Sequence, residues 1–315
     1  MTLHQTSGRW QYGMILAATT MLLWGILPIA LAVVLNVLDV YTITCVRFVI
    51  AFSVLAFYLK QQGQFPQGKQ LRSASFKLMA IALVFLGLNY LLFLMGLKLT
   101  SPTNVEVLMQ LAPVTFGLAA LVIFKERYSR LQWTGLGVMT LGLALFFHEQ
   151  LQVLLQSTAS YLLGNGLTVL ACITWTIYAL AQKQLLRVLP SPTIMLVIYG
   201  GCALLFLPLS QLPDLLELSL FQWGMLIFCG INTLLAYGAF SESLEHLEAS
   251  RVSAIISLTP LVTIASMQVA ARWFPGLIAP EHISALGFVG ALLVVGGSVA
   301  IALSKRMGNP EQLQS

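Results

Sequence analysis

The chain contains ten long apolar runs, and they determine whether it can fold in water or needs a lipid bilayer. At about 20 residues, each run is long enough to cross a bilayer core of roughly 30 Å. Hydrophobic residues make up 58% of the 315 and charged residues only 9%, whereas a soluble domain carries roughly 25% charge. The chain therefore lacks the polar side chains needed to cover a water-soluble surface. The runs are Tyr12–Val34, Thr42–Leu59, Leu78–Leu97, Pro102–Phe124, Leu131–Phe147, Leu162–Leu186, Thr193–Leu209, Leu220–Phe240, Ala249–Ala271 and Ile283–Leu303.

These runs are expected to be helices, because backbone groups without a hydrogen-bond partner are too costly in lipid. The alternation at period two that a transmembrane barrel needs is absent from them. The first run is too long for a signal peptide and keeps Trp10 and Tyr12 at its edge, so we expect a retained helix. The sequence thus predicts an all-α polytopic membrane protein with about ten transmembrane helices.

One passage of the chain occurs twice. Gly87–Leu92 reads GLNYLL, and Gly230–Leu235 reads GINTLL. In each half the next apolar run carries a proline near its middle, Pro113 and then Pro260, and a glycine-bearing run follows. We therefore predict an internal repeat, which in a membrane chain is the usual plan of a transporter with its site between the halves.

The basic residues indicate how the chain is oriented. With the N-terminus in the cytoplasm and ten crossings, only Lys98 and Arg272 fall in outer loops, and Arg47 lies near the outer end of the second run. This skew agrees with the positive-inside rule and places both termini in the cytoplasm of a plasma (inner) membrane protein. It also explains the net charge of +5 without nucleic acid as a partner. The cytoplasmic basic residues are Arg9, Lys60, Lys69, Arg72, Lys77, Lys125, Arg127, Arg130, Lys183, Arg187, Arg251, Lys305 and Arg306.

Each repeat holds five runs, so the second must enter the membrane upside down relative to the first. We expect two inverted five-helix repeats, residues 1–148 and 161–305, joined by an extracytoplasmic linker at 149–160 and followed by a cytoplasmic tail at 306–315. Such folds place a substrate near the membrane midplane and alternate access by rocking. One chain is expected to suffice for function, with the lipid bilayer and a small-molecule substrate as its partners.

The order of several short motifs resembles the drug/metabolite transporter superfamily, specifically its EamA-type ten-helix branch. The motifs span most of the chain. They are Leu23-Trp24-Gly25, Val46-Arg47-Phe48-Val49-Ile50-Ala51, Leu111-Ala112-Pro113, Phe124-Lys125-Glu126-Arg127, Thr174-Trp175-Thr176-Ile177-Tyr178, Leu258-Thr259-Pro260 and the glycines of Gly290–Gly297.

This resemblance implies a ten-helix secondary transporter that exports amino acids or other small metabolites. One departure concerns the end of the ninth run, where the family's glutamate is missing and Arg272-Trp273-Phe274-Pro275 leads into a longer loop. A gating role for that end is therefore not expected by analogy.

Glu106 is the leading candidate for the transport pathway, because an ionisable side chain inside a span is expensive and functional by default. Ser101 and Pro102 suit a helix start, which places Glu106 one turn inside the fourth run, on one helical face with Gln110 and Pro113. A coupling proton on Glu106 is a further possibility. Aligning the prolines pairs Ser253 with Glu106 and Ser257 with Gln110. The alternative is a polar stripe that only supplies interhelical hydrogen bonds.

Several further residues have two open interpretations. Pro113 and Pro260 each free a carbonyl and permit a bend, which marks either a hinge or a tolerated kink. Asn89 and Asn232 match by repeat and would bind substrate or bond to a neighbouring helix. Arg47 would attract a substrate carboxylate or serve as a structural cation.

The aromatic residues within the spans either line a cavity or fill the core, since membrane Tyr and Trp ordinarily prefer the interface. The cavity candidates among them are Trp24, Tyr90, Trp175, Tyr178 and Tyr237. The four cysteines all fall inside spans without metal-ligand spacing. We therefore expect no metal and no cofactor.

Three other functional classes compete with a secondary transporter. An enzyme is not expected, because the four histidines fall in tails or loops and neither G-x-S-x-G nor H-E-x-x-H occurs. A carrier for a phosphorylated sugar or nucleotide sugar would need clustered basic side chains, and only Arg47 approaches the membrane interior. A channel or non-transporting scaffold stays open. The sequence favours a secondary transporter, by alternating access, of a small neutral or zwitterionic metabolite such as an amino acid, moved outward.

Overall fold

The described part of the protein is built from helices. The computed structural model describes residues 7, 9–66, 68, 71, 74–124, 128–146, 148, 159–273 and 284–303, and no strand occurs among them. The α-helices are α1 (Trp10–Leu35), α2 (Val40–Gln61), α4 (Phe76–Leu99), α5 (Pro102–Leu108), α6 (Leu111–Ile123), α7 (Arg130–Phe146), α9 (Ala159–Leu185), α10 (Ser191–Phe206), α11 (Leu220–His246), α12 (Ala249–Ile256), α13 (Thr259–Trp273) and α14 (Ala285–Leu303). Two short 3₁₀ helices, η1 (Leu207–Leu209) and η2 (Leu212–Glu217), join α10 to α11.

Among the described residues, seven helical segments are long and apolar enough to cross a membrane. They are Trp10–Leu35, Val40–Gln61, Phe76–Leu99, Ala159–Leu185, Ser191–Leu209, Leu220–His246 and Ala249–Arg272. Shorter apolar helices cover Val114–Ile123 and Ala285–Ile301. The predicted all-α membrane class is therefore confirmed at this level. The predicted fourth run is divided between α5 and α6, and the fifth is the 17-residue α7.

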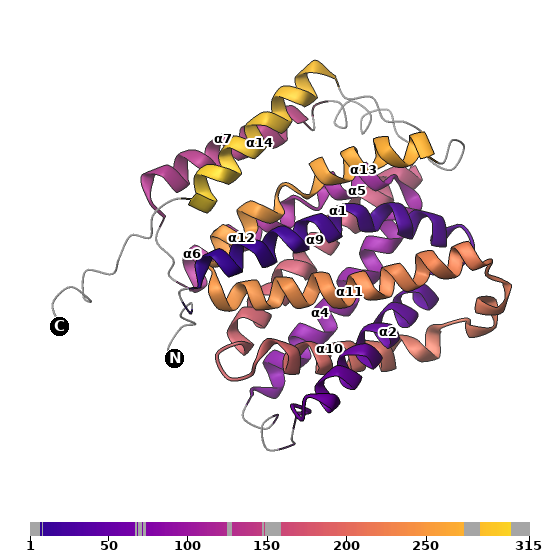
Figure 1. Ribbon diagram of the computed structural model, residues 1–315. Coiled ribbons are helices and arrows are strands. Elements are labelled where there is room, and N and C mark those ends of the chain that lie inside the picture. Colours follow the sequence, from indigo (N-terminus) through magenta and orange to yellow (C-terminus); the bar gives the residue numbers. More distant parts are fainter. Residues whose placement is uncertain are drawn as a thin grey trace, which may run out of the picture.

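The helices pack as a bundle in which each half of the chain covers the other (Figure 1). α1 packs on α11, and α4 packs on α9. α2 packs on α10, and α7 lies alongside α14 at one side of the bundle (Figure 1). The two halves of the sequence are thus not separate bodies, and residues from both meet in the interior.

The contact between α7 and α14 is close because glycines lie where the helices cross. A Cβ built on Gly142 would lie 2.7 Å from Gly290 O, and one on Gly297 would lie 2.5 Å from Gly135 O. Without side chains at these positions the two backbones approach directly, as small residues allow in membrane helices.

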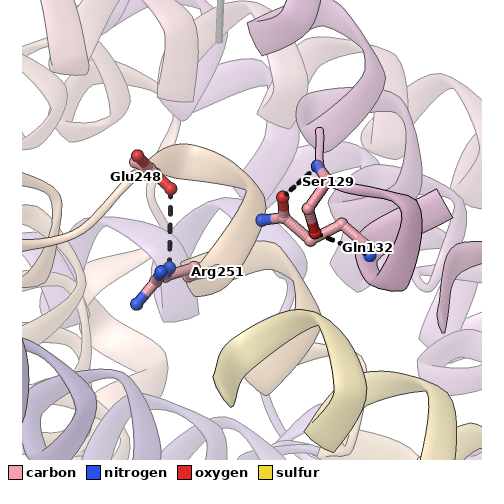
Figure 2. Close-up of polar contacts among 4 residues, drawn as sticks. All are labelled: Ser129, Gln132, Glu248 and Arg251. Carbon is pink, nitrogen blue, oxygen red and sulfur yellow. Dashed lines mark hydrogen bonds and ion pairs between the residues drawn. The ribbon is translucent and has the colours of Figure 1, made fainter. Parts of the chain in front are cut away.

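Reciprocal side-chain hydrogen bonds fix the starts of two helices. At α7, Gln132 N donates to Ser129 Oγ at 3.2 Å and Ser129 N donates to Gln132 Oε1 at 2.8 Å (Figure 2). Ser219 and Gln222 form the same arrangement at α11. Such capping boxes satisfy backbone donors that a helix start leaves unpaired. The start of α12 carries an ion pair of 3.4 Å between Arg251 and Glu248 (Figure 2).

Some sequence-based expectations lie outside the described residues. They concern most of the linker at 149–160, the tail at 306–315, the Lys125–Arg127 part of one motif, and the loop from Phe274 onward.

Candidate functional site

A cavity lies inside the bundle and is lined by both halves of the chain. Its empty volume is about 600 Å³, part of which opens to the surroundings. Nine of the described helices contribute to the wall, α1, α2, α4, α5, α6, α9, α11, α12 and α13, together with the two residues between α5 and α6. The lining residues are Trp24, Leu27, Arg47, Asn89, Tyr90, Phe93, Glu106, Met109, Gln110, Ala112, Trp175, Tyr237, Ile256 and Thr259.

The chain breaks into two half-helices beside this cavity in the first half of the sequence. α5 ends at Leu108 and α6 begins at Leu111, so Pro113 stands in the first turn of α6. Proline has no N–H for the carbonyl four residues earlier, that of Met109. Ala112 N donates to Met109 O instead, at 2.9 Å. The expected bend at Pro113 therefore coincides with a short break between α5 and α6, across which Gln110 keeps right-handed helical backbone angles.

The second half is interrupted at the matching place. α12 ends at Ile256 and α13 begins at Thr259, with Pro260 as its second residue. Here the carbonyl without a proline N–H is that of Ile256, and the Thr259 hydroxyl donates to it at 2.6 Å. In both halves the residues next to the interruption line the cavity. Irregular backbone at membrane depth is tolerated where it borders protein or a cavity.

Arg47 is buried in the wall formed by α2, with 2% of its surface exposed. Its Nε donates to Thr233 Oγ1 at 3.0 Å, and its guanidinium carbon lies 4.4 Å from the centre of the Tyr90 ring. Among the described residues this is its one hydrogen bond. The terminal guanidinium nitrogens therefore retain donor capacity at the cavity.

Glu106 on α5 is also buried, with 6% exposed. No described residue forms an ion pair or hydrogen bond with its carboxyl group. Gln110 Nε2 donates to the Glu106 backbone carbonyl at 3.1 Å, which leaves Gln110 Oε1 buried without a partner in the described structure. This part of the wall thus carries two hydrogen-bond acceptors, the Glu106 carboxyl group and Gln110 Oε1, that have no donor in the described structure.

Aromatic rings form another part of the cavity wall. The Trp24 ring lies 5.8 Å from Trp175 and 5.0 Å from Tyr237, in edge-on geometries. The Tyr237 hydroxyl donates to Asn89 Oδ1 at 3.4 Å, and Asn89 Nδ2 donates to Ala171 O at 3.0 Å. Asn89, in the first half of the chain, is therefore oriented by two partners from the second half.

The structure brings eight of the sequence candidates to the cavity and leaves others away from it. Tyr178 donates to Met195 Sδ, and Asn232 donates to Leu23 O at 2.7 Å. The hydroxyls of Ser253 and Ser257 donate to carbonyls of their own helix region. None of these four residues is among those that line the cavity in the described structure. The eight that do are Trp24, Arg47, Asn89, Tyr90, Glu106, Gln110, Trp175 and Tyr237.

Sequence reasoning missed the apolar part of the wall and one hydroxyl. Thr259 was detectable, because a hydroxyl directly before a matched proline can take the carbonyl that the proline leaves free. The others carry no such signal, since they are ordinary apolar residues in apolar runs. They are Leu27, Phe93, Met109, Ala112 and Ile256.

Comparison with known proteins relates this architecture to membrane transport. The model of the EamA-like transporter family matches residues 11–148 and 162–303. The chain is 36% identical over 296 residues to "Uncharacterized inner membrane transporter YhbE" of Escherichia coli (strain K12), covering 94% of this chain and 92% of the relative. It is 32% identical to an "Uncharacterized transporter" of Haemophilus influenzae, covering 94% of this chain and 96% of the relative.

A more distant relative carries a functional name. The "Probable amino-acid metabolite efflux pump" of Salmonella typhimurium is 25% identical over 215 residues, or 64% of this chain and 68% of the relative. One solved crystal structure matches with a TM-score of 0.70 and 18% identity, covering 95% of this chain and 99% of that one. That likeness concerns the fold alone.

Proposed function

The chain belongs to the EamA-like transporter family, and on this premise we propose that it exports a small neutral or zwitterionic metabolite, such as an amino acid, by alternating access. The observation that carries the proposal is the cavity bordered by both helix interruptions. Discontinuous helices at matched positions of two halves are the best pointer to a transporter's substrate site. The wall combines apolar rings with two charged side chains, Arg47 and Glu106.

Ten crossings in two inverted repeats are supported by the packing pattern. In the repeat, α1 corresponds to α9 and α4 corresponds to α11. The contact between α1 and α11 is therefore equivalent to the contact between α9 and α4, and both occur. The α11–α2 and α4–α10 contacts are related in the same way. This reciprocity is expected of two similar units around a pseudo-two-fold axis. We propose that α5 with α6, and α12 with α13, each complete one crossing.

The proposed orientation puts both termini in the cytoplasm of the inner membrane. The related E. coli protein is named an inner membrane transporter. At the helix ends, Lys60, Lys77, Lys183 and Arg187 then share the cytoplasmic side. This distribution follows the positive-inside rule. A single protein chain is proposed as the functional unit.

We propose that Glu106 carries the coupling proton. A lone carboxylate away from water is expensive in its charged form, and no described residue neutralises it. Protonation from one side and release to the other would link its charge to the direction of access.

Counterflow in proteoliposomes tests transport. The purified chain is loaded with one unlabelled solute from a panel of amino acids, sugars and nucleotide sugars, and entry of the labelled solute is followed. Trans-stimulation by an amino acid is expected, and the name of the Salmonella relative makes amino acids the first solutes to assay. Uptake of polyanions alone would overturn the amino acid proposal, and flux without trans-stimulation would indicate a channel.

Glu106→Gln tests the coupling. We expect its flux to lose dependence on an imposed pH gradient, because the amide cannot exchange a proton. Glu217→Gln, on the exposed surface of η2, is the matched control and should keep that dependence. Unchanged flux and unchanged pH dependence in Glu106→Gln would refute the coupling role.

A further inference from the structure

Hydrogen-bond acceptors and donors occupy different parts of the cavity wall. On the α5 side, the unpaired groups of Glu106 and Gln110 are a carboxyl and an amide oxygen. The free amide atom of Gln110 is its oxygen, because Gln110 Nε2 already donates to the Glu106 backbone carbonyl. A site with acceptors only is suited to a group with donors only, and an ammonium group, with three donors and no acceptor, is such a group.

The α2 and α4 side offers the opposite chemistry. Arg47 has only donors, and its guanidinium is held in place by Thr233 and by the Tyr90 ring. The Tyr90 hydroxyl is itself buried with no partner in the described structure. A guanidinium fork beside a hydroxyl is suited to a carboxylate.

The two charged groups come from helices on different sides of the bundle. α5 packs on α1, α4, α9 and α13, whereas α2 packs on α1, α4, α10 and α11. Figure 1 accordingly shows α5 and α2 on opposite sides of α1. In the described structure Arg47 and Glu106 do not form an ion pair with each other. A charge of each sign is thus held apart across one cavity.

Much of the rest of the wall is apolar. It carries the rings of Phe93 and Trp175 and the aliphatic side chains of Leu27, Met109 and Ile256. A cavity that combines one cationic group, one anionic group and apolar side chains fits a solute with both charges and an apolar side chain.

From this division we propose that the cavity binds the zwitterionic form of an α-amino acid with an apolar side chain. Its ammonium group lies at Glu106 and Gln110, and its carboxylate lies at Arg47 and Tyr90. The assignment rests on the proposed transport function and narrows its substrate. It is compatible with proton coupling, because one carboxylate can exchange its proton for the ammonium group.

The test measures binding of three probes to the purified full-length chain by isothermal titration calorimetry. The probes are L-leucine, N-acetyl-L-leucine, which lacks the ammonium group, and L-leucinamide, which lacks the carboxylate. Loss of one charge-assisted hydrogen-bonded contact corresponds to roughly tenfold to 100-fold in affinity. We expect each analogue to bind at least about tenfold more weakly than L-leucine.

Two variants assign the poles. Glu106→Gln should lower the affinity for L-leucine to that for N-acetyl-L-leucine and should leave the affinity for N-acetyl-L-leucine unchanged. Arg47→Gln should weaken L-leucine to the level of L-leucinamide and leave that probe unchanged. If Arg47 only supports Tyr90 and Thr233, all three probes should weaken together in Arg47→Gln, and that result would overturn the assignment.

Thr44→Val is the matched control, because Thr44 lies on α2, is fully buried and donates only to the backbone carbonyl of Val40. Its affinities should equal those of the unaltered chain. The comparison of analogues in the unaltered chain stands even where a variant fails to fold. Equal binding of all three probes, or no binding of L-leucine, would sink the inference. Counterflow of another solute would then leave the transport proposal intact, whereas no counterflow with any solute would overturn transport itself.

Discussion

Gly142→Ala should destabilise the protein by wedging α7 away from α14. The added Cβ would lie 2.7 Å from both Gly290 O and Val294 N. Ordinary van der Waals contacts of a Cβ begin at 3.4 Å, so each contact is 0.7 Å too short. Because both atoms belong to the backbone of α14, a side-chain rotation cannot relieve the overlap, and the helices must separate.

The expected loss is about 1–3 kcal/mol, the usual range for overpacking a well-packed interior. The same helix supplies a control, since a Cβ at Gly137 would meet nothing within 4 Å. Gly137→Ala makes the same chemical change in the same helix, and alanine is roughly 0.5–1 kcal/mol better than glycine inside a helix. The two variants should therefore shift the free energy of unfolding in opposite directions.

The buried cysteines provide the assay. Cys45, Cys172, Cys202 and Cys229 are free and buried, so a thiol-reactive fluorophore should label them only as the fold opens. Thermal labelling curves in detergent should show a Tm several degrees lower for Gly142→Ala and a higher Tm for Gly137→Ala. Equal Tm values for the two variants would refute the direct backbone contact between α7 and α14.

Two further predictions concern buried polar contacts and the second interruption. Ser241→Ala should lower stability by about 1–3 kcal/mol in the same labelling assay, because Ser241 joins the side chains of Gln182 and Ser191 in one buried hydrogen-bonded network; an unchanged Tm would contradict that network. Pro260→Ala should slow counterflow while raising Tm, because a restored N–H lets α12 continue toward α13; equal or faster counterflow would refute a moving role for the interruption.

The membrane class and the positions of the interruptions were readable from the sequence. Both depend on local chemistry, since an apolar run requires a helix and a proline removes one donor. Pro113 and Pro260 lie directly after short breaks in the helices, two residues long in each half, at the places where the sequence predicted bends. The extent of an interruption depends on neighbours such as the Thr259 hydroxyl, which takes the freed carbonyl.

Which side chains reach the cavity was less predictable. Ser253 and Ser257 occupy positions equivalent to Glu106 and Gln110, but their short hydroxyls donate to nearby backbone carbonyls. A longer Glu or Gln side chain reaches the cavity even where it also bonds to nearby backbone, as Gln110 does, whereas a serine hydroxyl is satisfied locally. Equivalence by repeat therefore identified the helix and its depth but could not tell whether a side chain faces its own backbone or the cavity. Apolar wall residues such as Phe93 carry no sequence signal at all, because lipid-facing, core and cavity positions use the same residue types.

Each helix interruption has an electrical consequence. Where α5 gives way to α6, a helix C-terminus with about −0.5 of an elementary charge stands beside a helix N-terminus with about +0.5. The junction of α12 and α13 repeats this arrangement. The partial charges cancel in pairs, so the backbone bordering the cavity carries little net field. If the cavity is the substrate site, as proposed, the charge of the solute accepted is left to side chains such as Arg47 and Glu106, and a change of solute class requires substitutions in the wall and no rebuilding of the helices.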